Sequence, residues 1–150
     1  MSLVSGRISS EGAIVVVLVG VSRNRQALLE KHGFPVPAKI HVNAQLDIGS
    51  FATAFLPSVF ESLGIQPFGI IPVRTPSTKP GQPCPCDQFD VSVTFLSGMT
   101  PITISSVHAI ASDDFDSHED GVHAILGRDI LDRCTLNYCG PERTFQLALP

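Results

Sequence analysis

Short runs in which apolar and polar residues alternate limit the fold of this 150-residue chain more than any other feature. The runs 39–46 and 89–95 place apolar side chains at every second position, which is typical of strands with one buried face. The chain also contains 12 Pro and 12 Gly residues, and short strands separated by such turn residues favour an all-β fold. We therefore predict a closed or nearly closed β-barrel of about eight or nine strands with two or three short helices.

The length of the chain supports one hydrophobic core. A chain of this mass buries about two thirds of its surface, and two independent domains are not expected. We expect a flexible segment over residues 1–12 and a single domain over residues 13–150. The most apolar run, residues 13–19, is far shorter than the roughly 20 residues of a transmembrane helix, and its flanks do not suit a signal peptide. We interpret it as a buried strand and expect a cytoplasmic protein without a membrane partner.

Helix signals are clearest in two places. Ser22 is a typical N-cap, and residues 27–29 give the following segment a modest apolar face. Pro57 and Gly64 are typical of the first position and the end of a second helix. We predict helices over 23–32, 57–63 and 128–132.

Composition excludes several classes of function. A net charge of −4 with only 10 Lys and Arg residues, and no basic block, argues against nucleic acid as a partner. Cys84 and Cys86 are too close for an easy disulfide, and the four cysteines lack the spacing of a zinc site, so we expect reduced structural thiols. The acidic run 113–120, with His118 and the nearby His123, departs from a calcium-loop pattern. We expect a solvated loop there, and neither a metal nor a cofactor.

Asp47 is the strongest candidate for a catalytic residue. It ends an apolar-faced strand and is followed by Ile48, Gly49 and Ser50. A carboxylate held at a strand end by a glycine turn is well placed for chemistry, because glycine allows backbone or ligand to approach closely. Asp-Gly turns are common, so this motif alone is a weak signal.

A second motif follows about 80 residues later, as Ile125-Leu126-Gly127-Arg128. Together the two motifs resemble those of the retropepsin-like aspartic proteases, and of their small bacterial members in particular. The resemblance extends from about residue 13 to 149. It is clearest in residues 52–65 and 125–138, which resemble the segments that follow each motif in that family.

The resemblance implies a retropepsin-like β-barrel that hydrolyses peptide bonds as a homodimer. Asp47 from each copy would form a dyad that activates a water at acidic to near-neutral pH, without a metal. Gly49, Ser50, Thr78 and Gly81 would bind an extended peptide substrate, the last two within a flap over residues 75–84. Structural support of the site would come from Ile48, Ile125, Leu126, Gly127 and Arg128, and residues 134–138 would lie near the dimer interface.

Two positions depart from the pattern of the family. Ile48 stands where the family has Thr or Ser, whose hydroxyl links the two catalytic loops across the dimer. This change favours an alternative function, a catalytically inactive barrel that acts as a peptide-binding or dimerisation module. Arg128 would pair in retroviral relatives with a carboxylate just after the first motif, where this chain has Phe51 and Ala52. We expect Asp129 or another acid to serve as its partner.

Overall fold

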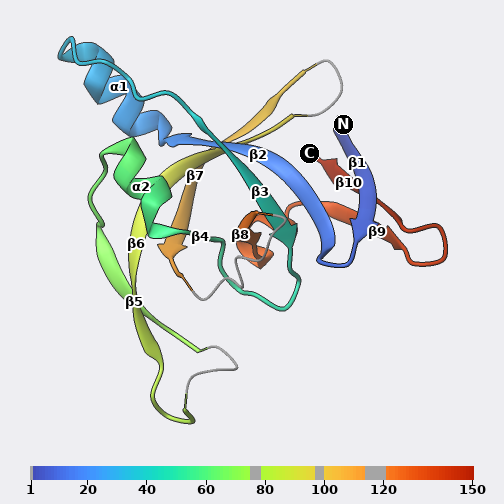
Figure 1. Cartoon of the computed structure of the whole chain (residues 1–150). Coiled ribbons are helices and arrows are strands. Elements are labelled where there is room, and N and C mark those ends of the chain that lie inside the picture. Colours follow the sequence, from blue (N-terminus) through green and yellow to red (C-terminus); the bar gives the residue numbers. More distant parts are fainter. Residues whose placement is uncertain (1, 75–78, 97–99, 114–120) are drawn as a thin grey trace.

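The computed structural model describes residues 2–74, 79–96, 100–113 and 121–150 (Figure 1). Within these residues the chain forms strands and short helices in the order shown in Figure 1. The strands are β1 (Ser2–Ser9), β2 (Gly12–Val21), β3 (Ile40–Leu46), β4 (Ala54–Phe55), β5 (Gly69–Val73), β6 (Cys84–Phe95), β7 (Ile102–Ala111), β8 (Val122–Leu126), β9 (Thr135–Cys139) and β10 (Thr144–Leu149). The helices are α1 (Arg23–Lys31), α2 (Pro57–Leu63) and α3 (Arg128–Leu131).

The predicted closed β-barrel is confirmed. Strands β6, β7, β4, β8, β3 and β2 follow one another in the sheet, and β2 pairs again with β6, which closes the ring. Most of these pairings are antiparallel, whereas β3 with β8 and β4 with β7 run parallel. Closure satisfies the backbone hydrogen bonds of the central strands and removes their exposed edges.

Strand β1 corrects the expectation of a flexible segment over residues 1–12. It pairs along most of its length with β10, and its last residues pair with β2. The side chains of Val4 and Ile8 are buried in the main core. A strand pairing with residues 144–149 is a contact between the two ends of the chain, and no local pattern around residues 1–12 reveals it.

The main core fills the barrel with aliphatic and phenylalanine side chains. Helix α2 contributes Val59, Phe60 and Leu63 to this core, and the ring of Phe60 stacks on that of Phe89 with centroids 4.0 Å apart. The predicted bounds of α2 are confirmed, with Pro57 in its first turn and Gly64 in the left-handed conformation at φ 65°. Helix α2 therefore packs its buried face on the core of the barrel.

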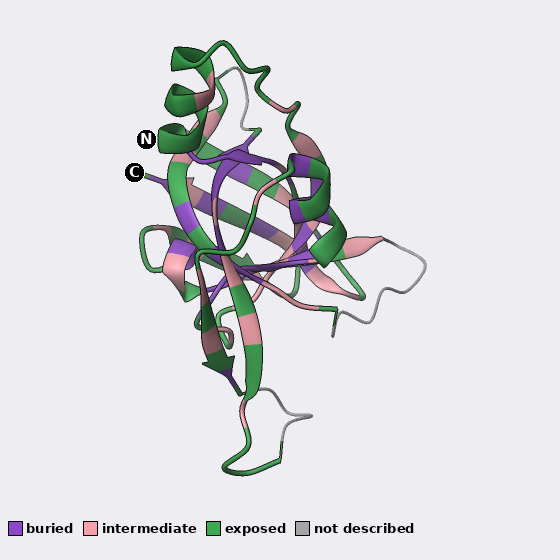
Figure 2. Ribbon diagram, turned by 90° about the vertical axis from the view of Figure 1, so that its left-hand side faces the viewer, coloured by how far each residue is buried: buried purple, intermediate pink, exposed green. Residues whose placement is uncertain are grey.

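Helix α1 forms where it was predicted, but its apolar face is not packed. The hydroxyl of Ser22 accepts a hydrogen bond from the backbone N–H of Arg25, as a helix N-cap does. No residue of α1 is buried, and Figure 2 shows the helix exposed on each of its turns. No helix within the described residues is long and apolar enough to cross a bilayer.

Candidate active site

Strand β3 and the turn after it fix the position of Asp47. The strand buries Val42 and Ala44 on the predicted apolar face, and the backbone N–H of Asp47 donates to the carbonyl of Leu126 at 3.0 Å. The backbone N–H of Gly49 donates to Asp47 Oδ1 at 2.8 Å. A Cβ at position 49 would lie 3.1 Å from the same oxygen, so glycine gives the carboxylate room to receive this hydrogen bond.

Ser50 ties the Asp47 turn to the rest of the chain. Its N–H donates to the carbonyl of Asp47 at 3.2 Å, and its hydroxyl donates to the carbonyl of Ala52 at 2.7 Å. Its own carbonyl accepts from the N–H of Arg128 at 2.8 Å. Because a carbonyl has two lone pairs, Ser50 keeps one acceptor site for a ligand.

Two large apolar side chains on the same loop face solvent. Ile48 is 67% exposed and Phe51 is 44% exposed. Asp47 itself is half-buried, and its neighbours Ile48 and Gly49 are exposed. In the single chain, the carboxylate therefore lies on an open surface with apolar side chains beside it.

The segment of Ile125 to Arg128 lies directly against this loop, as the second motif predicts. Ile125 and Leu126 belong to β8, which pairs with β3 on one side and β4 on the other. Gly127 is buried, and a Cβ on it would lie 2.5 Å from the carbonyl oxygen of Ala52. Only glycine allows the two backbone segments to come so close.

Arg128 contributes through its backbone. Its N–H binds Ser50, while its side chain is exposed. The expected pairing with Asp129 is wrong, because that carboxylate accepts hydrogen bonds from Thr53 and from the N–H of Ile130. In the part of the chain that the structure describes, no acid forms an ion pair with Arg128.

Thr53, which no sequence motif singled out, connects the two motifs. Its hydroxyl donates to Asp129 Oδ1 at 2.7 Å and accepts from the N–H of Gly127 at 3.2 Å. Its own N–H donates to Asp129 Oδ2 at 3.0 Å. A threonine between two alanines in an apolar run was the available signal, because a fully buried hydroxyl needs a hydrogen-bond partner.

Strands β5 and β6 form the hairpin expected to carry the flap. Gly81 lies in a turn beyond these strands at φ 75°, and a Cβ there would meet nothing within 4 Å, so it does not pack against the Asp47 loop. Thr78 lies outside the described residues. A smaller apolar cluster joins the end of β5 to the segment after the Asp47 loop, and its buried members are Ala52, Ala54, Val73 and Ile110.

The described residues contain neither a cluster of side chains suited to bind a metal nor a disulfide. His118 and most of the acidic run lie outside them, and His123 is an exposed residue of β8. No group of three or more His, Cys, Asp or Glu side chains suited to a metal occurs among the residues that are described. Burial raises the pKa of the Cys134 thiol, although the nearby Arg133 opposes this shift.

Comparison with known proteins shows what this fold is similar to. No protein-family model and no curated protein matches the chain. Among solved structures, a retropepsin-like aspartic protease from Rickettsia conorii matches with a TM-score of 0.57 and 16% sequence identity. The match covers 98% of this chain and 90% of that chain. The chain therefore has the fold of the retropepsin-like aspartic proteases, which confirms the fold that the two motifs predicted.

Proposed function

We propose that this chain is one half of a homodimeric aspartic endopeptidase in which Asp47 is the catalytic residue. The observation that carries the proposal is the Asp47 turn, in which a single carboxylate is oriented by the Gly49 N–H on an open surface. An aspartic protease needs two carboxylates that face one water, and this chain supplies one such turn. A twofold axis beside the turn would bring two copies of Asp47 together.

The exposed apolar side chains around Asp47 support a second copy at this place. Ile48 and Phe51 flank the carboxylate, and their apolar side chains are exposed to solvent in the single chain. Their burial in a dimer would stabilise the association, since burying apolar area is favourable at about 25 cal/mol per Å². Contact between the two Ile48 side chains would replace the hydroxyl contact that this chain lacks.

The proposed mechanism follows from placing two carboxylates a few ångströms apart. They cannot both ionise at low cost, so the pair shares one proton. The ionised member takes a proton from water, whose oxygen attacks the carbonyl carbon of the peptide bond. The protonated member donates a hydrogen bond to the carbonyl oxygen, and a proton then passes to the leaving amine. The step needs no covalent intermediate.

The proposed substrate is an extended peptide between the Asp47 turn and the flap. Gly49 and Ser50 would offer backbone carbonyls to it, and no hydrogen bond within the described residues occupies the Gly49 carbonyl. We assign Thr78 and Gly81 to the flap side of the peptide. We propose apolar subsites for this peptide, because the segments 52–56 and 68–74 on either side of the proposed cleft are rich in apolar residues.

Cleavage of an unfolded protein substrate between about pH 3 and pH 8 tests this proposal. We expect the wild-type protein to cut and Asp47→Asn to be inactive, with Asp113→Asn as a matched control because Asp113 is an exposed carboxylate in a loop. Below the dimer dissociation constant, the rate should rise with the square of protein concentration. Equal cleavage by wild type and Asp47→Asn would contradict the proposal.

Ile48 favours a second candidate function, a dimeric barrel that binds peptides without cutting them. Isoleucine cannot donate the hydrogen bond that threonine or serine makes at this position in the family, and a catalytic pair without that bond is held less rigidly. A folded, dimeric wild-type protein that binds an extended peptide but cleaves nothing would establish this alternative, and an active Ile48→Thr variant would identify Ile48 as the cause.

A further inference from the structure

Helix α1 is an element to which the proposed peptidase gives no role. It lies between β2 and β3, and no residue of α1 is buried. A helix of nine residues is marginal in water on propensity alone, and most helices in proteins are stabilised by packing. Because no residue of α1 is buried, packing against the core contributes little to its stability, and its surface is available to a partner outside the chain.

One face of α1 combines an apolar centre with cations. Leu28 is 53% exposed, with Arg25 three residues before it and Lys31 three residues after it on the same side of the helix. Glu30, the only acid of the helix, lies on the other side, where it accepts a hydrogen bond from the Gln26 amide at 3.0 Å. The Leu28 face therefore carries positive charge that no acid of the helix neutralises.

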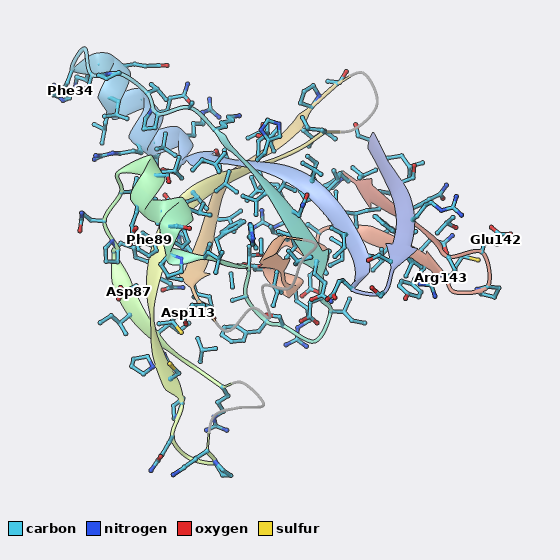
Figure 3. The ribbon with its side chains drawn as sticks, viewed as in Figure 1. Phe34, Asp87, Phe89, Asp113, Glu142 and Arg143 are labelled. Atoms are coloured by element: carbon cyan, nitrogen blue, oxygen red, sulfur yellow. The ribbon has the colours of Figure 1, made fainter. Side chains whose placement is uncertain are left out.

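The loop after α1 extends this face. Phe34 is 62% exposed and Val36 is 37% exposed. Figure 3 places Phe34 at the outer end of the helix, away from the barrel. Lys39 then anchors the returning chain, because its Nζ donates to Thr94 Oγ1 at 3.0 Å. The projecting segment, residues 22–38, is thus fixed to the barrel where the chain returns.

Charge is unevenly divided between this segment and the rest of the protein. Residues 22–38 hold three of the 10 Lys and Arg residues and one of the 14 Asp and Glu residues, a net charge of +2. Since the whole chain carries −4, the remainder carries −6. The segment is thus complementary to an anionic surface, whereas the barrel is not.

We propose that residues 22–38 dock the protein on an anionic lipid bilayer. Leu28 and Phe34 enter the headgroup region, and Arg25 and Lys31 contact lipid phosphates, as in other basic interfacial helices. Protein–protein interfaces usually bury about 800 Å² on each partner over a well-packed centre, more than separate side chains on one short helix and its loop provide. A fluid bilayer accommodates such protruding side chains without a matching shape. The expectation of no membrane partner rested on the lack of a spanning segment, and docking on the bilayer surface requires none.

Docking through α1 would leave the Asp47 turn accessible to a substrate. Helix α1 and its loop precede β3, and Asp47 follows it, so they lie at opposite ends of the strand (Figure 1). A strand of seven residues is roughly 23 Å long. This exceeds the screening length of about 8 Å at physiological salt, so repulsion between the far end of the barrel and the bilayer is largely screened. Docking stands whether or not Asp47 is catalytic.

Flotation with vesicles tests the proposal directly. Vesicles of phosphatidylcholine alone are compared with vesicles containing about one third phosphatidylserine, at about 0.1 M salt. We expect the wild-type protein to bind the anionic vesicles at least about tenfold better, and Arg25→Glu with Lys31→Glu to lose this binding. Arg7→Glu with Arg133→Glu changes the net charge equally at two exposed positions outside the segment, and we expect it to bind like wild type.

A second variant separates charge from insertion. Leu28→Ser with Phe34→Ser should weaken binding to anionic vesicles while the thermal unfolding curve stays unchanged, because neither side chain is buried. The proposal is overturned if wild type does not float with anionic vesicles, or if both charge-reversed pairs bind equally. If the wild-type protein does not float with anionic vesicles, the expected ligand of the Leu28 face becomes an acidic protein.

Discussion

Thr53 and Asp129, 76 residues apart in the sequence, are joined by two hydrogen bonds, from the Thr53 hydroxyl at 2.7 Å and from its backbone N–H at 3.0 Å. The same hydroxyl accepts from the N–H of Gly127. The segment after the Asp47 turn and the start of α3 are therefore held together by a side-chain network. This network replaces the arginine–carboxylate pair that the sequence had led us to expect.

Removal of the Thr53 hydroxyl should destabilise the protein and loosen the site. Thr53→Val keeps the shape of the side chain but leaves Asp129 Oδ1 without its hydroxyl donor, at an expected cost of about 1–3 kcal/mol in the free energy of unfolding. Urea denaturation measures this change. Ser62→Ala removes an exposed hydroxyl that binds the Ser58 carbonyl, and it should change stability by less than about 0.5 kcal/mol. Equal losses in the two variants would contradict the role of the network.

Gly127 should not tolerate a methyl group. In Gly127→Ala the Cβ would lie within 3 Å of three backbone atoms of Ala52, and relieving this overlap must move the backbone next to the Asp47 turn. We expect a loss of about 3 kcal/mol or more in stability. Gly140→Ala is the matched control, because a Cβ there meets nothing within 4 Å. Circular dichroism melts of the two variants compare them, and similar melting temperatures would count against this close contact.

A charge at position 48 should block dimer formation without unfolding the chain. Because Ile48 is 67% exposed in the single chain, Ile48→Glu costs little within it, but two such carboxylates would repel each other across the proposed axis. Sedimentation velocity should show a monomer. Leu28→Glu, an equally drastic change at an exposed leucine on α1, should leave the dimer intact. A stable dimer of Ile48→Glu would place the interface elsewhere.

The pH dependence of thiol alkylation should distinguish Cys134 from Cys84. Burial raises the pKa of Cys134, so less of its reactive thiolate exists at a given pH, whereas Cys84 is exposed. With iodoacetamide at about pH 8, mass spectrometry should find Cys84 modified first. Since the pKa of Cys134 is higher in the folded protein than in the unfolded chain, its contribution to stability is full at low pH. That contribution falls as pH rises from the pKa of the thiol in the unfolded chain through its pKa in the folded protein. Faster modification of Cys134 would contradict this assignment.

Local rules account for the parts of the site that the sequence predicted. The alternation over residues 39–46 places the buried face of β3, and the glycine turn after Asp47 follows from the four residues themselves. Pro57 and Gly64 bound α2 for reasons that act within one helical turn. These features need only neighbours in the chain, so the sequence contains all the information they require.

The remaining features depend on residues far apart in the chain. Strand β1 forms because β10 supplies its hydrogen-bond partners. Asp129 accepts a hydrogen bond from Thr53 because folding places the two residues side by side. The barrel packs α2 and leaves α1 outside, although both sequences contain apolar residues. The sequence by itself determined the strand pattern, the Asp47 turn and the helix ends, which are set by short-range sterics and hydrogen bonds. Only the tertiary structure decided which polar groups meet and which apolar groups remain exposed, because both depend on the closure of the sheet.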